Sequence, residues 1–97
     1  MLVQFTPASQ RDLVDVARFI ASDSPQRAAT FAAELILACE ALGLHPERYA
    51  IMPRYAEKAY RRRPFGHYSI IYAIDQEEVR VVRVVSSWVD LDTVLDD

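Results

Sequence analysis

The sequence predicts an α+β fold with the element order β-α-α-β-β-β, in which an N-terminal αα-hairpin packs on one face of an antiparallel sheet. Two observations support this prediction. Apolar residues recur every three or four positions in the first half of the chain, as in amphipathic helices. In the second half they recur every two positions, as in strands. The 97 residues suffice for one hydrophobic core, so residues 1–97 are predicted to form a single domain.

The first half predicts one short strand and two helices. Residues 2–5 form a strand candidate that ends at Thr6-Pro7. Thr6 and Ser24 each precede a proline, which is the pattern of an N-cap followed by proline at the first helical position. We therefore expect helices over residues 7–22 and 25–43, joined as antiparallel neighbours by a very short link.

Two further expectations concern particular residues of these helices. In the first helix, Leu13, Val16 and Ile20 define the apolar face, which places Asp12 on the solvent side with Asp15. Gly43 is expected to end the second helix in the left-handed conformation.

The second half predicts three strands and a loose C-terminal turn. A loop is expected over residues 44–57, and a polar edge strand over residues 58–63, which a turn at Pro64-Phe65-Gly66 closes. Two more strands cover residues 67–74 and 79–85, and a charged hairpin turn joins them. The tail over residues 88–97 has Leu91, Val94 and Leu95 at the spacing of one amphipathic helical turn.

Composition and charge exclude several classes of protein. The net charge is −3, although residues 48–83 carry eight basic and four acidic residues. A nucleic-acid-binding domain usually carries a basic excess, so the basic segment favours an acidic protein partner instead. We expect a cytoplasmic protein without a signal peptide or membrane span, and the single Cys39 cannot form an intrachain disulfide.

The sequence predicts no catalytic residue, metal site or cofactor. The two histidines, His45 and His67, belong to no recognisable acid–base pair. No glycine-rich phosphate loop, nucleophile elbow or metal-binding motif is present.

Arginines and one tryptophan are the candidate binding residues. Arg61, Arg62 and Arg63 lie in the polar strand, where alternation places Arg61 and Arg63 on one face and Arg62 on the other. They form either a solvated edge that prevents aggregation or a contact strip for a partner. Arg83 lies in an otherwise apolar strand and must be paired or reach a binding site. Trp88 is either a lid on the core or an exposed anchor.

Several strings resemble the ParE branch of the RelE/ParE toxin superfamily, from bacterial type II toxin–antitoxin systems. One runs from Phe19-Ile20-Ala21 through Ser24-Pro25 to Ala28 and resembles the helix hairpin of ParE. A second runs from Arg61 through Pro64 and Gly66 to Tyr68, Ile70 and Tyr72 and resembles the strand-turn-strand pattern. A third, Val81-Val82-Arg83-Val84-Val85 followed by Asp90, resembles the last strand and its exit.

The resemblance implies a toxin that inhibits DNA gyrase without enzymatic chemistry and is neutralised by a cognate ParD-like antitoxin. It implies contact with DNA only through the antitoxin. Two alternatives stay open: a RelE-like ribosome-dependent mRNA endoribonuclease, and an inactive member kept for complex formation. Ser86 stands where the nuclease branch carries an acid or base, which favours the non-enzymatic interpretation.

Under this resemblance, Arg61, Arg62, Arg63, Arg83 and Trp88 are predicted to bind the antitoxin or the target. We expect a helical and then extended antitoxin segment along the hairpin, with acidic side chains near Arg61, Arg63 and Arg83. Deletion of residues 91–97 is expected to leave folding and antitoxin binding largely intact and to lower toxicity.

Overall fold

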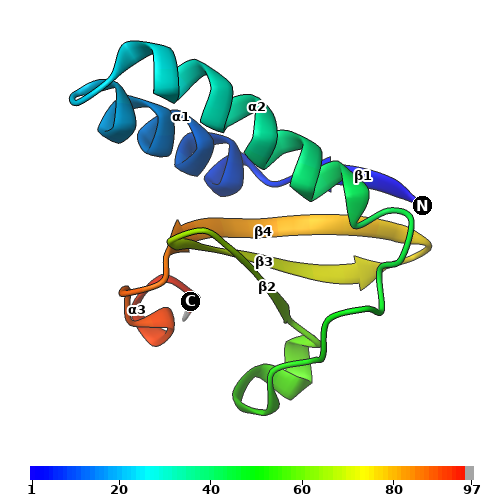
Figure 1. The fold of residues 1–97 in the computed structure, drawn as a ribbon. Coiled ribbons are helices and arrows are strands. Elements are labelled where there is room, and N and C mark those ends of the chain that lie inside the picture. Colours follow the sequence, from blue (N-terminus) through cyan, green and yellow to red (C-terminus); the bar gives the residue numbers. More distant parts are fainter. Residues whose placement is uncertain (96–97) are drawn as a thin grey trace.

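A computed structural model describes residues 1–95 and confirms the predicted α+β fold. Helices α1 (Pro7–Ala21) and α2 (Pro25–Ala41) lie side by side on one face of a four-stranded sheet (Figure 1). The 3-10 helix η1 (Pro53–Lys58) and the short helix α3 (Leu91–Leu95) pack against the other face. Within residues 1–95, no helix is both long and apolar enough to cross a bilayer.

The sheet has the strand order β1-β4-β3-β2 and is antiparallel except for one pair. Its strands are β1 (Leu2–Phe5), β2 (Arg61–Phe65), β3 (Tyr68–Asp75) and β4 (Glu78–Ser86). The pairs β2–β3 and β3–β4 are antiparallel, whereas β1 runs parallel to β4, with Val3 opposite Val79. Because each of the two hairpins reverses the chain, β4 runs in the same direction as β2. Strand β1, which precedes the two helices in the chain, lies at the edge of β4 that β3 does not occupy.

The helices begin where the sequence predicts. Thr6 Oγ1 accepts a hydrogen bond from the Ser9 N–H at 3.0 Å, and Ser24 Oγ accepts one from the Arg27 N–H at 3.2 Å. The expectation of a left-handed Gly43 is wrong, because its φ is not positive. A Cβ at Gly43 would lie 2.3 Å from the backbone oxygen of Met1, so glycine is required there by the close approach of β1.

The expected loop and polar strand differ from the structure more than the other elements, whose ends differ by one or two residues. The expected loop contains η1, and the polar strand begins at Arg61 and continues through Pro64. The Met52 N–H donates to Tyr60 O on the side of the chain away from β3. By alternation, the backbone of Pro64 also points to that open side, so its missing N–H costs no ladder hydrogen bond.

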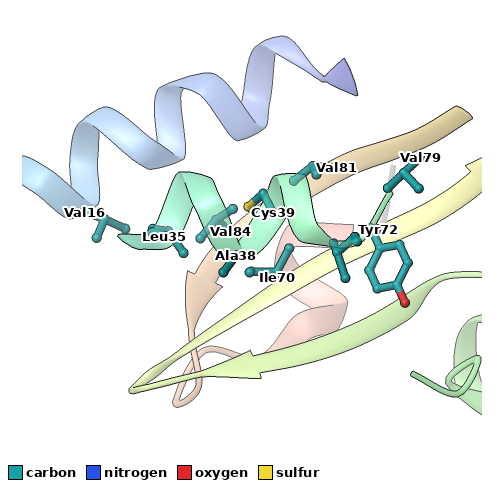
Figure 2. Packing of buried hydrophobic residues seen from close by; sticks show 10 residues of the cluster. Val16, Leu35, Ala38, Cys39, Ile70, Tyr72, Val79, Val81 and Val84 are labelled. Carbon is teal, nitrogen blue, oxygen red and sulfur yellow. The ribbon is translucent and has the colours of Figure 1, made fainter. Parts of the chain in front are cut away.

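The sheet is buried on both faces. The main core lies between the helices and the sheet (Figure 2) and includes Leu35, Cys39, Ile70, Tyr72, Val81 and Val84. A smaller core on the opposite face contains Tyr60, Ile71, Ala73 and Leu95. The predicted C-terminal turn is therefore present as α3. Its last residue, Leu95, is 4% exposed. Asp96 and Asp97, which belong to the predicted tail, lie outside the described residues.

Candidate functional site

A buried ion pair joins α1 to β4. Arg83 donates from Nε to Asp12 Oδ2 at 2.7 Å and from Nη2 to Asp12 Oδ1 at 2.9 Å. The Val84 N–H also donates to Asp12 Oδ2, at 2.8 Å. Asp12 is only 8% exposed, so the expectation that it faces solvent is wrong. The hydrogen bonds that Arg83 donates to the Asp12 carboxylate raise the pKa of Arg83 above its usual value.

The end of β1 explains why a carboxylate is buried at this place. Strand β1 ends at Phe5, opposite Val81, so within residues 1–95 the rest of β4 has no neighbouring strand on that side. Helix α1 covers this open edge: Thr6 Oγ1 donates to Val82 O at 2.8 Å, and Asp12 accepts from the Val84 N–H. Asp12 thus replaces a missing strand as hydrogen-bond acceptor.

A bulge in β4 lies directly before Arg83. Ile71 pairs with Arg83 and Tyr72 pairs with Val81, so Val82 is an extra residue in the ladder. Arg83 also donates from Nη1 to Val94 O at 3.2 Å, which connects α1, β4 and α3 at one point. The sequence indicated that Arg83 needed a partner. It gave no signal that separated Asp12 from Asp15, the exposed acidic residue of α1.

A groove of about 940 Å³ lies beside this ion pair, between the end of the helix hairpin where α1 and α2 are joined, the start of β3 and the end of β4. Phe19 of α1 and Trp88, which follows β4, line it and are 73% and 83% exposed. The ring of Trp88 stacks on His67, with centroids 6.4 Å apart. Phe31 of α2 also lines the groove and contacts Tyr68 at a centroid distance of 5.7 Å. Large exposed aromatic rings around an apolar groove are typical of a protein-binding surface.

The three consecutive arginines of β2 lie away from the Asp12–Arg83 pair and hold neighbouring segments. Arg61 donates from Nη1 to Tyr49 O at 2.6 Å, and Arg63 donates from Nη1 to Ala38 O at 2.5 Å. Arg62 donates from Nε to Ser69 Oγ at 2.8 Å, on the other face of the sheet. The predicted alternation is therefore confirmed, and all three side chains are half-buried rather than fully solvated.

Cys39 and Ser86 are the remaining candidate reactive groups. Burial raises the pKa of the Cys39 thiol to about 12, so this residue is no thiolate nucleophile at neutral pH. Ser86, at the exit of β4, accepts a hydrogen bond from the Trp88 N–H at 3.2 Å. Among residues 1–95, no group of three histidine, cysteine or acidic side chains is placed to hold a metal ion.

Comparison with known proteins identifies the family. The model of the family described as "ParE toxin of type II toxin-antitoxin system, parDE" matches residues 3–87. The chain belongs to the ParE toxin family. This membership confirms the resemblance seen in the sequence, and the match includes four of the five predicted binding residues, Arg61, Arg62, Arg63 and Arg83. Trp88 follows directly after it.

A solved structure has the same fold. It is described as "Chromosomal ParDE TA system from P. aeruginosa" and superposes with a TM-score of 0.75 at 15% sequence identity. The alignment covers 89% of this chain and 95% of that chain. No curated protein sequence matches this ParE-family chain significantly. At this identity the structural likeness establishes the common fold.

Proposed function

We propose that this ParE-family toxin inhibits DNA gyrase by binding, without enzymatic chemistry, and that a cognate ParD-like antitoxin neutralises it in the bacterial cytoplasm. The observation that carries the non-enzymatic part is the mutual pairing of Asp12 and Arg83 beside an apolar, aromatic groove. Contact with DNA is proposed to occur only through the antitoxin.

Cleavage of RNA without a metal requires a base for the 2′-hydroxyl, an acid for the leaving oxygen and a cation for the phosphate. In the groove, Arg83 directs two of its nitrogen atoms to Asp12, and Asp12 accepts three hydrogen bonds, two from Arg83 and one from the Val84 N–H. These two groups are therefore occupied in holding the fold. The exit of β4 offers Ser86, which is neither an acid nor a base at neutral pH.

The exposed rings of Phe19 and Trp88 support a role in protein recognition. Tryptophan and other large aromatic residues dominate the binding energy of many protein interfaces. The family description and the P. aeruginosa ParDE system support an antitoxin as one partner. We propose that the groove is a contact site for a protein partner, with Trp88 as its anchor.

A gyrase supercoiling assay with the purified chain tests this proposal. We expect inhibition by the wild type, and we expect Phe19→Ala and Trp88→Ala to weaken inhibition or antitoxin binding at least tenfold. Leu37→Ala is the matched control, because Leu37 is an exposed apolar residue outside the groove and is 65% exposed. The same preparations are added to translating ribosomes.

Two results would contradict the proposal in different ways. Codon-phased cleavage of the message on ribosomes would establish the RelE-like endoribonuclease instead. Antitoxin binding without any inhibition of gyrase or growth would identify an inactive member kept for complex formation.

A further inference from the structure

The position of Trp88 at the groove depends on the backbone segment that carries it, residues 87–90. Trp88 is 83% exposed, and within residues 1–95 its ring has one aromatic contact, the stack on His67. A side chain with so few contacts of its own takes its place from the backbone on either side of it. The way in which the two ends of this segment are fixed therefore decides where the indole lies.

The end of the segment next to β4 is fixed by hydrogen bonds to its neighbours. The Ser87 N–H donates to His67 O at 2.8 Å, and the Val89 N–H donates to Ser86 O at 3.1 Å. The Trp88 N–H donates to Ser86 Oγ at 3.2 Å. These bonds set the direction in which the chain leaves β4, and α3 fixes the other end.

Polar side chains of η1 hold α3 in place. Arg54 donates from Nε to Asp92 Oδ1 at 2.8 Å and from Nη2 to Asp92 Oδ2. The Tyr55 hydroxyl donates to Asp92 Oδ1 as well. We call Arg54, Tyr55 and Asp92 the η1–α3 clamp. Because Asp92 lies four positions after Trp88 in the chain, the clamp restrains the far end of the segment that carries the indole.

The clamp and the groove are separate places in the fold. Within residues 1–95, no residue of η1 lines the groove. The three residues of the clamp line a hollow of about 580 Å³ between η1 and α3 instead. An effect of the clamp on binding in the groove must therefore act through α3 and the segment before it.

We propose that the η1–α3 clamp positions Trp88 for binding of a protein partner, which makes Arg54, Tyr55 and Asp92 positioning residues of the groove. This inference rests on the proposed role of Trp88 as the anchor. With α3 docked, residues 87–90 form a loop that is fixed at both ends. With α3 released, they belong to a free chain end, which samples many more conformations. A partner then has to immobilise the indole itself, so binding is weaker.

Loss of the clamp should leave the rest of the fold intact. The side chains of Arg54 and Asp92 are 72% and 41% exposed, and exposed ion pairs contribute little to the stability of a whole domain. The main core between the helices and the sheet contains no residue of α3. Variants of the clamp are therefore expected to fold, with the change confined to α3 and the segment before it, and circular dichroism melting checks this.

The first measurement is the time-resolved fluorescence anisotropy of Trp88 in the full-length chain. Trp88 is the only tryptophan in the sequence, so the signal reports this segment alone. We expect Arg54→Ala and Asp92→Ala to depolarise faster on the nanosecond timescale, on which loops and chain ends move. Tyr55→Phe removes only the hydroxyl, so a smaller change in the same direction is expected. Asp75→Ala is the matched control, because Asp75 forms an exposed ion pair with Arg80 at 3.8 Å and lies at the opposite end of β3 from the groove.

The second measurement compares these variants in gyrase inhibition and antitoxin binding. In the assay that Trp88→Ala weakens, we expect Arg54→Ala and Asp92→Ala to lose at least about fivefold and Asp75→Ala less than about twofold. The double variant Trp88→Ala/Asp92→Ala should match Trp88→Ala within about twofold, because the clamp acts through the indole. Arg54→Asp/Asp92→Arg restores a pair of opposite charges and should recover part of the loss caused by Arg54→Asp.

Three outcomes would overturn the inference: unchanged Trp88 anisotropy in the clamp variants, wild-type binding by clamp variants whose indole is mobile, or additive losses in the double variant, which would indicate a role of the clamp that is independent of Trp88. In each of them the proposed function stands as long as Trp88→Ala weakens binding. If Trp88→Ala has no effect in either assay, the proposed role of the groove fails, and the anisotropy decides separately whether the clamp holds the segment.

Discussion

Replacement of Asp12 by alanine removes the acceptor that joins α1 to β4. Three hydrogen bonds end on this carboxylate, from Arg83 Nε at 2.7 Å, Arg83 Nη2 at 2.9 Å and the Val84 N–H at 2.8 Å. The substitution leaves the guanidinium without its counter-charge and the Val84 N–H without an acceptor. Loss of one partner of a buried ion pair typically costs about 3–5 kcal/mol.

We expect the lower end of that range, about 3 kcal/mol, because the Arg83 side chain is 25% exposed and water can partly solvate it after the change. For a domain of this size, about 3 kcal/mol corresponds to a decrease in Tm of about 12–24 °C. Asp12→Asn keeps an oxygen for the Val84 N–H, so a smaller loss of about 2 kcal/mol is expected.

Urea denaturation followed by far-UV circular dichroism measures these free energies. Asp15→Ala is the control, because the Asp15 side chain lies on the same helix and is 72% exposed, and it should change stability by less than about 0.5 kcal/mol. The double variant Asp12→Asn/Arg83→Met should cost less than the sum of the two single changes, because each single change isolates the other partner. A loss below about 1 kcal/mol for Asp12→Ala, or strict additivity in the double variant, would refute the argument.

Four further outcomes follow from the structure. Hydrogen bonds from Arg54 and Tyr55 lower the pKa of Asp92 to about 2. The stabilisation of α3 docking by these hydrogen bonds is therefore complete above about pH 4 and is lost as the pH falls towards about 2. The NMR methyl signals of Leu95 should report this transition, and Asp92→Asn should abolish it. The Cys39 thiol should react with a thiol reagent at pH 8 only after denaturation, since burial raises its pKa to about 12, and fast labelling of the native protein would contradict this. Gly43→Ala should cost about 1–3 kcal/mol in urea denaturation because the new Cβ meets Met1 O, and an unchanged midpoint would contradict that close contact. Deletion of residues 91–97 should cost at least about 1.5–3 kcal/mol of stability, since Leu95 is 4% exposed, in contrast to the sequence-based expectation of intact folding.

The elements of the fold followed from local patterns in the sequence. Thr6-Pro7 and Ser24-Pro25 predicted the starts of both long helices because capping depends on residues next to each other in the chain. The alternation in residues 67–74 predicted β3 for the same reason. The limits of β2 were less predictable. Pro64 fits a strand only where its backbone points away from β3, and that orientation depends on the register with which β2 pairs with β3.

The candidate site was predicted only in part. Arg83 and Trp88 were identified as candidates, and both line the groove. Phe19 lies in the predicted first helix, and nothing local showed that its ring would line the same groove as that of Trp88. Arg61 and Arg63 were identified by their charge, but their hydrogen bonds to backbone oxygens of Tyr49 and Ala38 depend on how the loop before η1 and helix α2 pack.

The sequence by itself determined the α+β class, the helix hairpin, the family and the need of Arg83 for a partner, since each depends on periodicity or on residues close together in the chain. The tertiary structure alone decided that Asp12 is that partner, 71 residues away. It also decided the groove, whose lining residues come from different elements. The physical reason is that a buried charge or a groove is defined by distances of a few ångströms across the fold, which a linear sequence does not specify.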